Sequence, residues 1–214
     1  MKPYTKIVTD KTTGMIEKIS DSREGLVVTY RPMRYHNITK DDMLNGEGLR
    51  VVLWTAGCSH HCKGCHNPVT WNPNDGLEFT EKEKEEIATE LRKNYISGIT
   101  FSGGDPLHEA NQETILELVQ WVRKNFPNKT IWLYSGYRLD EIFQLHEEDL
   151  QYSPVADVPS RKGMEIRAEI IRNIDVFVDG RFVEELKSEP YPFAGSTNQN
   201  VISVENGNFV LKKY

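Results

Sequence analysis

The cysteines are the feature that most restricts what this chain can fold into. All three fall within one stretch of eight residues, at Cys58, Cys62 and Cys65. An odd number of closely spaced cysteines does not suit a disulfide framework, and in a reducing compartment such a cluster more often holds metal or carries out redox chemistry. We therefore expect a metal centre here rather than cysteines that are buried as small apolar side chains.

Two kinds of metal centre are compatible with this spacing. In a structural zinc site, the three thiolates would recruit His60, His61 or His66 as the fourth ligand, and the chain would be a binding module. In a 4Fe-4S cluster, the three thiolates would leave one iron free to bind another molecule, and the chain would be a catalyst. Zinc sites more usually combine ligand pairs from two separate knuckles, and this sequence has no second cysteine pair. The spacing therefore favours the iron-sulfur cluster.

Short buried strands and amphipathic helices alternate along the middle of the chain. This alternation predicts an α/β fold with a parallel sheet and right-handed crossovers. A closed eight-unit barrel takes about 250 residues, which this chain of 214 residues does not reach, so we expect an open, partial (β/α) barrel. The expected strands are 49–55, 99–101, 130–134 and 175–178, and the expected helices begin with the capping box at Thr80 and continue with 115–122, 138–146 and 165–172.

Two segments look peripheral to this barrel. Residues 1–32 alternate in the manner of β-strands, and we expect them to form a small N-terminal β extension, with the barrel domain covering 33–214. Residues 144–163 contain prolines and mixed charge, and they are expected to be an insertion. Near the C-terminus, Asn206-Gly207 between two apolar segments indicates a hairpin with a type I′ turn.

The charge balance bears on the partners of the protein. The 26 Lys and Arg residues and the 32 Asp and Glu residues give a net charge of -6, which argues against nucleic acid as a partner because duplex binding relies on basic side chains that neutralise phosphates. The longest stretch without charge, 190–204, is too short and too polar for a transmembrane helix. The first ten residues lack the features of a secretory signal. We expect a cytoplasmic protein with no membrane partner.

A second motif, Gly103-Gly104-Asp105-Pro106, directly follows the expected second strand. Taken alone, it could be an ordinary strand-to-helix turn. However, two glycines also let a ligand approach the backbone closely, and Asp105 offers an acceptor for an ammonium group. Because ligands of parallel α/β sheets bind at the carboxyl ends of the strands, this turn and the cysteine loop should lie together. An amino acid that chelates the free iron would suit that edge.

Together, the two motifs resemble those of the radical S-adenosylmethionine enzymes, which carry a three-cysteine loop after the first strand and a Gly-Gly-acidic-Pro turn after the second. Between Met33 and Ile202, the chain is more specifically similar to the activating enzymes of anaerobic ribonucleoside-triphosphate reductase. The segments that carry this similarity are 33–38, 45–50, 64–71, 101–108, 131–137, 178–182 and 195–199.

This resemblance implies a fold, a reaction and a set of partners. The fold would be the open partial barrel of the radical S-adenosylmethionine type. A 4Fe-4S cluster held by the three cysteines would reductively cleave S-adenosyl-L-methionine, and the 5′-deoxyadenosyl radical would remove hydrogen from a glycine of the large subunit of the anaerobic reductase. An electron donor such as flavodoxin would reduce the cluster.

The resemblance also assigns residues to the cofactor, at the ends of successive strands. No catalytic residue is expected beyond the ligands of the cluster and of the cofactor. The family carries an Asp-x-Lys motif at the fourth strand end, where this chain has Asp179 and Arg181. The expected cofactor-binding residues are Gly103, Gly104, Asp105, Ser135, Tyr137 and Asp179. Asn198 and Gln199 are candidates for the same cavity mouth, although polar residues in such a stretch are more often plain turn formers.

Other functions stay open at this point. The chain could be a different radical S-adenosylmethionine enzyme, one that activates a glycyl-radical protein such as pyruvate formate-lyase or that acts on a small molecule. The zinc-stabilised binding module is the alternative from a different class.

Overall fold

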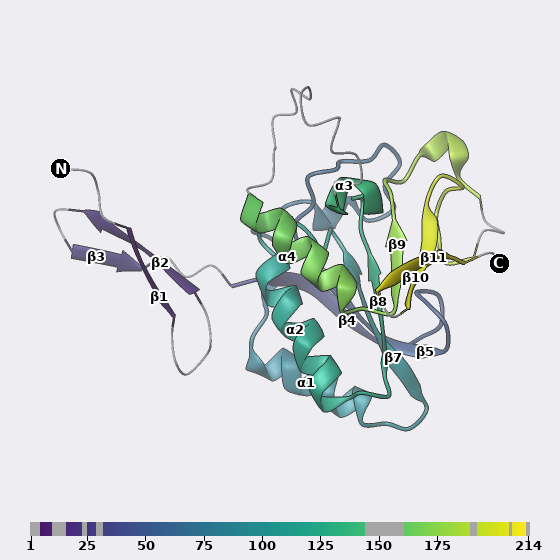
Figure 1. Ribbon diagram of the computed structural model, residues 1–214, viewed down its shortest axis with the longest axis horizontal. Coiled ribbons are helices and arrows are strands. Elements are labelled where there is room, and N and C mark those ends of the chain that lie inside the picture. Colours follow the sequence, from purple (N-terminus) through teal and green to yellow (C-terminus); the bar gives the residue numbers. More distant parts are fainter. Residues whose placement is uncertain are drawn as a thin grey trace. The chain divides into compact units, whose positions relative to one another are not determined.

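The computed structural model describes residues 5–9, 16–22, 25–28, 32–143, 161–188, 192–205 and 207–212. Two compact units, Met1–Pro32 and Met33–Tyr214, make up the chain (Figure 1), and each is described by itself. The first unit, for which the sequence predicts a small sheet, contains an antiparallel sheet in the order β1-β2-β3. Its strands are β1 (Thr5–Thr9), β2 (Ile16–Ser22) and β3 (Gly25–Val28).

The second unit is built on one mixed sheet of eight strands in the order β11-β10-β9-β8-β7-β5-β4-β6. The four central strands, β5, β7, β8 and β9, are parallel, and β4, β6, β10 and β11 flank them in antiparallel pairs. The bounds are β4 (Arg34–Asp42), β5 (Leu49–Thr55), β6 (Leu77–Glu78), β7 (Ile96–Gly103), β8 (Thr130–Tyr134), β9 (Val176–Asp179), β10 (Asn200–Glu205) and β11 (Asn208–Leu211).

The helices follow from the order of the parallel strands. Each crossover from β5 to β7, β8 and β9 moves one strand along the sheet in the same direction, so right-handed crossovers place the helices on one face. Figure 1 shows α1, α2 and α4 together on that side. The helical segments are η1 (Pro68–Thr70), α1 (Glu81–Leu91), α2 (Gln112–Asn125), α3 (Leu139–Phe143), α4 (Arg161–Arg172) and η3 (Glu184–Leu186).

The start of α1 shows how local sequence sets an element. The Thr80 hydroxyl accepts from the backbone N–H of Lys82, and the Glu83 carboxylate accepts from the backbone N–H of Thr80 at 2.9 Å. This reciprocal pair is the capping box that the sequence predicts. Among the residues that the structure describes, no helix has both the length and the apolar character that a bilayer span requires.

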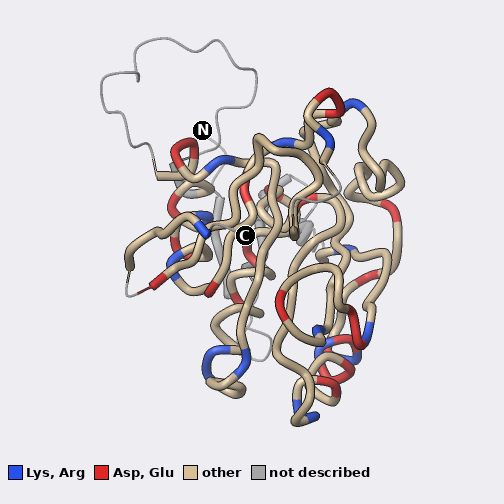
Figure 2. The backbone as a smooth tube through the Cα atoms, turned by 90° about the vertical axis from the view of Figure 1, so that its right-hand side faces the viewer, with Lys and Arg blue, Asp and Glu red and all other residues tan. Residues whose placement is uncertain are grey.

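Alternation along the strands divides the apolar side chains between two layers. On the helix side, residues such as Phe101, Leu133 and Phe177 pack with the apolar faces of the helices in the main core. On the opposite side, Trp132 and Val178 belong to a smaller cluster. Figure 2 shows Lys and Arg interleaved with Asp and Glu along the backbone rather than gathered into one stripe.

A buried arginine closes the amino-terminal end of the parallel strands. Arg50 is fully buried, and its guanidinium donates to Thr100 Oγ1 at 2.7 Å, the Ile99 carbonyl at 2.7 Å and the Glu47 carbonyl at 3.0 Å. It also donates to both the hydroxyl and the carbonyl of Thr130, each at 2.9 Å. Burial lowers the pKa of Arg50 to about 10, and the five hydrogen bonds compensate for the loss of water around the cation.

The prediction of a parallel α/β core is confirmed, with corrections at its margins. The strands β4 and β6, which pair antiparallel beside β5, were not expected from the sequence. The helix expected at 138–146 is described only as α3, and the one expected at 165–172 begins earlier, at Arg161. Residues 161–163 of the expected insertion therefore belong to α4, while residues 144–160 lie outside the described residues.

The expected C-terminal hairpin is present as β10 and β11. The two strands pair in antiparallel register, with Glu205 opposite Asn208. This register leaves a two-residue connection, of which Gly207 has the positive φ of +80° that a type I′ turn needs. Asn206 lies outside the described residues.

Candidate metal centre

The cysteine loop leaves the carboxyl end of β5 and is fastened to its neighbours by backbone hydrogen bonds. The N–H of Gly57 donates to the Thr70 carbonyl at 2.7 Å, and the N–H of Cys58 donates to the Trp71 carbonyl at 2.9 Å. From the end of β7, the N–H of Asp105 donates to the Gly57 carbonyl at 2.7 Å. The sequence prediction that the loop and the glycine turn lie together is therefore confirmed.

The three cysteines are free, half-buried and line one cavity of about 120 Å³. Gly103, Gly104 and Ser135 line the same cavity. The remaining lining residues come from the cysteine loop, the residue after η1, the ends of β7, β8 and β9, and the residue before β10: His60, His66, Trp71, Ser102, Tyr134, Gly136, Gly180, Arg181, Phe182 and Gln199. The site thus lies where ligands of parallel α/β sheets bind.

Burial disfavours the thiolate forms of Cys58 and Cys62. It raises the pKa of Cys58 to about 12, and the negative charge of Asp105 adds to this effect. Burial also raises the pKa of Cys62. Metal binding must therefore displace thiol protons, and thiolates are the ligands that iron-sulfur clusters take from proteins. Three sulfurs around one cavity fit such a cluster.

The zinc alternative requires a tighter arrangement, in which four side chains converge on one ion. In the described ranges, no three His, Cys, Asp or Glu side chains are arranged to hold a single metal ion. His61, one of the histidines considered as a fourth ligand, instead packs edge-on against the Trp71 ring, with the ring centroids 4.9 Å apart.

The two glycines of the turn are required by close packing between strand ends. A Cβ on Gly103, whose φ is +107°, would lie 2.5 Å from the backbone nitrogen of Thr55. A Cβ on Gly104 would lie 2.5 Å from the Gly57 carbonyl oxygen. Both distances are shorter than any side chain tolerates, so the turn can lie this close to the cysteine loop only without side chains.

Asp105 lies behind the cavity wall, and its exposed fraction is 1%. One carboxylate oxygen accepts from the Leu107 N–H at 2.8 Å and from the Ser135 hydroxyl at 2.9 Å. The other lies 2.6 Å from His60 Nε2 and accepts from the Gly136 N–H at 3.1 Å. Asp105 is not among the lining residues. The Asp105 carboxylate is therefore hydrogen-bonded to other groups of the protein, whereas the sequence predicted that it would bind the cofactor.

Of the other residues predicted to bind the cofactor, some line the cavity and some do not. Ser135 lines the cavity, whereas Tyr137 does not. The Tyr137 ring lies between the imidazole of His60, at 4.6 Å between centroids, and the Arg167 guanidinium, at 4.0 Å. Asp179 is also outside the lining; it is buried and accepts from the Leu139 N–H at 2.9 Å and from the Asn200 side chain at 2.8 Å.

Several lining residues were not assigned to the cofactor from the sequence. Arg181, which the sequence noted only beside Asp179, lines the cavity. Of the two candidates for the cavity mouth, Gln199 lines it and Asn198 does not. Tyr134 could have been found, because it alternates with Ile131 and Leu133 on β8 and so shares the face of Trp132.

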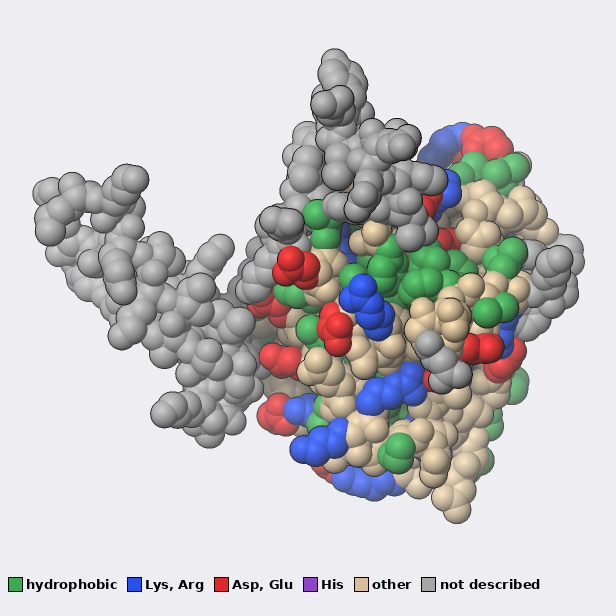
Figure 3. All heavy atoms as spheres, in the orientation of Figure 1, with side chains coloured by type: hydrophobic (Ala, Val, Ile, Leu, Met, Phe, Trp, Pro, Cys, Tyr) green, Lys and Arg blue, Asp and Glu red, His purple; other side chains and the backbone are tan. Residues whose placement is uncertain are grey.

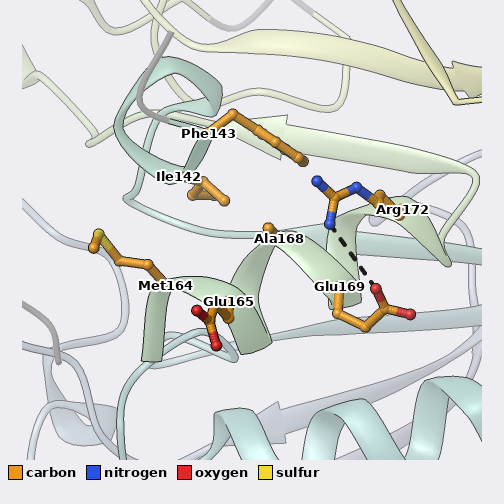
Figure 4. Close-up of a pocket in the computed structure, with 7 residues that line it drawn as sticks. All are labelled: Ile142, Phe143, Met164, Glu165, Ala168, Glu169 and Arg172. Carbon is orange, nitrogen blue, oxygen red and sulfur yellow. Dashed lines mark ion pairs between the residues drawn. The ribbon is translucent and has the colours of Figure 1, made fainter. Parts of the chain in front are cut away.

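A second cavity, of about 420 Å³, lies between α3 and α4 and contains none of the predicted site residues. Figure 4 shows the Phe143 side chain directed toward Arg172, whose guanidinium lies 5.1 Å from the ring centroid. Arg172 also forms an ion pair with Glu169 at 3.9 Å. Figure 3 shows apolar side chains gathered on the face that carries these helices.

Comparisons with known proteins agree with the geometry. Residues 44–202 match the family described as a 4Fe-4S single cluster domain. Three relatives that share the name anaerobic ribonucleoside-triphosphate reductase-activating protein come from Enterobacteria phage T4, Escherichia coli K12 and Haemophilus influenzae. The phage protein is 38% identical over 175 residues, which cover 82% of this chain and 97% of the relative. The Escherichia coli protein is 39% identical over 79% of this chain and 97% of its own length, and the Haemophilus protein 36% over 78% and 96%.

Proposed function

Because this chain belongs to the anaerobic ribonucleoside-triphosphate reductase-activating proteins, we propose that Cys58, Cys62 and Cys65 hold its 4Fe-4S cluster. The chain is an activating enzyme of the radical S-adenosylmethionine type. When bound, the cluster and S-adenosyl-L-methionine supply the reductive cleavage that generates a 5′-deoxyadenosyl radical, and with it a glycyl radical on the reductase. The protein's own contribution is to bind, orient and shield these groups.

The observation that carries the residue assignment is the shared cavity. Three half-buried free thiols border the same space as the backbone of Gly103 and Gly104. Three thiolates leave one iron of a 4Fe-4S cluster without a protein ligand, and the bare backbone of the glycine turn gives the cofactor room beside it.

The cofactor contacts can be assigned more narrowly than the sequence allowed. Gly103, Gly104 and Ser135 would touch the cofactor, because they line the cavity. Asp105, Tyr137 and Asp179 would act from behind the wall, because their polar or aromatic groups are engaged by other residues of the chain. Arg181 also lines the cavity, and its positive charge would suit the carboxylate of S-adenosyl-L-methionine.

The shape of the sheet supports a macromolecular substrate. The central strands follow one another in chain order, β5-β7-β8-β9, with helices on one side, which is the winding of a barrel, and the sheet stays open at β6 and β11. We interpret it as an open partial barrel. An incomplete barrel leaves its radical exposed unless a partner covers the mouth, and the large subunit of the anaerobic reductase, which carries the target glycine, would do this. An electron donor such as flavodoxin would reduce the cluster.

Anaerobic turnover tests this proposal. Protein reconstituted with iron and sulfide and then reduced should convert S-adenosyl-L-methionine to methionine and 5′-deoxyadenosine. Adding the reductase should raise the yield and produce a glycyl radical signal in electron paramagnetic resonance. Cys62→Ala should abolish both signals, and His61→Asn, in the same loop, should keep both.

Two results would contradict parts of the proposal. Rapid turnover on a small metabolite without any protein partner would overturn the assignment of the reductase as substrate. An intact cluster in the Cys62→Ala protein would overturn the ligand assignment.

A further inference from the structure

The imidazole of His60, in the middle of the cysteine loop, is hydrogen-bonded at both ring nitrogens. Nε2 lies 2.6 Å from Asp105 Oδ2, and Nδ1 lies 3.1 Å from Nε of Arg181. Because a guanidinium only donates, Nδ1 is the acceptor, and the proton on Nε2 bonds the carboxylate of Asp105. The His60 side chain is 5% exposed, so this pairing is shielded from water.

The turn after β8 packs against the imidazole ring of His60. A Cβ on Gly136 would lie 2.3 Å from Cδ2 of His60, so the ring occupies the space that any other residue would fill. The N–H of Gly136 donates to the Asp105 carboxylate, and the Tyr137 ring meets the imidazole edge-on at 4.6 Å. Backbone, carboxylate and aromatic ring thus all converge on His60.

The other charged side chains of the same loop constrain its cysteines less than His60 does. Lys63 forms ion pairs with Glu184 and Glu185, each at 3.1 Å, but the Lys63 side chain is 78% exposed. Exposed pairs of this kind contribute little. His61 is exposed. His60, placed two residues from both Cys58 and Cys62, is the buried anchor of this part of the loop.

We propose that His60 is a positioning residue, which fixes Cys58 and Cys62 relative to the Gly103-Gly104 edge. Asp105 acts through it, as the acceptor that orients the imidazole, rather than by binding the ammonium group of the cofactor. This inference rests on the proposed function, because it concerns the alignment of the cluster with S-adenosyl-L-methionine. Hydrogen-bonding partners that orient a metal site typically contribute a factor of about 10 to 100 in affinity or activity when they are lost.

The test compares the same substitution at two neighbouring histidines. His60→Asn removes the reach to Asp105, while His61→Asn changes an exposed side chain of the same loop. Both proteins should contain the cluster, since all three cysteines remain. Titration of S-adenosyl-L-methionine, followed by the change in the electron paramagnetic resonance spectrum of the reduced cluster, should give an apparent Kd raised about tenfold or more in His60→Asn and unchanged in His61→Asn.

Two further variants distinguish a positioning role of His60 from a general loss of structure: a conservative substitution of His60 and a double variant with Asp105. In His60→Gln, the amide nitrogen lies near the place of Nε2 and can donate to Asp105, so most of the affinity should return. If Asp105 acts through His60, the double variant His60→Asn, Asp105→Asn should bind the cofactor no worse than the weaker single variant. If the two losses multiply instead, Asp105 affects cofactor binding by a route other than His60, and the proposal is wrong.

The wild-type protein and His60→Asn together separate a wrong function from a wrong role of His60. A wild-type protein without cluster or cofactor binding would refute the function itself. Wild-type cofactor affinity in His60→Asn would refute only the positioning role. Loss of the cluster in His60→Asn would also overturn it, because His60 would then be needed to hold the metal rather than to align it.

Discussion

The two ends of the parallel strands differ in how far their polar groups are already satisfied. At the amino-terminal end, Arg50 is fully buried, donates five hydrogen bonds and packs 5.5 Å from the centroid of Trp132. At the carboxyl end, three free thiols and the turn at Gly103 and Gly104 border a cavity. At the first end the guanidinium is paired within the protein, whereas at the second end the thiols border a cavity.

The contrast shows how one sheet can provide both rigidity and a reaction site. Arg50 joins β5 to β7 and β8, so the strands are held in register at the end that does no chemistry. The same strands end at their carboxyl side in the glycine turn and the cysteine loop that border the cavity.

Arg50→Met should destabilise the protein most. The substitution leaves buried acceptors such as the Ile99 and Thr130 carbonyls without a donor, which should cost about 3 to 5 kcal/mol of unfolding free energy. Urea unfolding of the metal-free protein measures this, with Arg50→Lys as a control that keeps the charge but loses the planar fork. A change below about 1 kcal/mol, within the usual range of surface substitutions, would mean that the closed end does not hold the strands.

Gly104→Ala should disturb the open end with a smaller loss of stability. The new methyl group would lie 2.5 Å from the Gly57 carbonyl and 2.7 Å from the Thr70 carbonyl, so the cysteine loop must shift. We expect a cost of about 1 to 3 kcal/mol, together with weaker binding of S-adenosyl-L-methionine. In Gly195→Ala the nearest atom is in the Phe182 ring, at 3.1 Å, so that variant should be milder. Equal effects of the two variants would contradict this explanation.

Thr80→Ala removes the side-chain cap of α1, and Thr80 is not among the residues that line the cavity. Loss of the hydroxyl acceptor should lower the unfolding free energy by about 1 kcal/mol, with cluster content unchanged. Thr80→Ser should restore most of this loss. A fall in iron content in Thr80→Ala would show that α1 and the metal site are coupled.

Glu83→Gln tests the same cap through pH. Burial raises the pKa of Glu83, but hydrogen bonds from the Thr80 hydroxyl and backbone outweigh burial and lower it overall. A lowered pKa contributes stability above the pKa of the unfolded chain, about 4.3, and this contribution disappears as the pH falls through the folded-state pKa. The stability difference between wild type and Glu83→Gln should therefore be present at neutral pH and shrink in acid. A difference independent of pH would rule out the ionised cap.

Local signals explain what the sequence could predict of the fold. The strands at Leu49–Thr55 and Thr130–Tyr134 were predicted to the residue, because each is a short buried segment that ends at a turn. The start of α1 followed from the capping box. In contrast, β4 has an irregular burial pattern and depends on pairing with β5 and β6, which no local pattern reveals.

At the candidate site, too, the sequence predicted what local patterns carry and missed what depends on residues far apart in the chain. The cysteines and glycines could be identified because their spacing along the chain carries the signal. The direction of Asp105 could not, since its partner His60 lies 45 residues away in the sequence and Ser135 30 residues away. Whether a carboxylate at a strand end faces a ligand or the protein depends on which donors the neighbouring turns supply.

We propose that the carboxyl end of the parallel strands holds a 4Fe-4S cluster with one iron left for the cofactor. Metal and sulfide analysis of the anaerobically reconstituted protein, combined with electron paramagnetic resonance of the reduced form with and without S-adenosyl-L-methionine, tests it directly. We predict about four irons and four sulfides per chain and a spectrum that changes when the cofactor is added. Tightly bound zinc without a visible chromophore, or a cluster spectrum that the cofactor leaves unchanged, would contradict the claim.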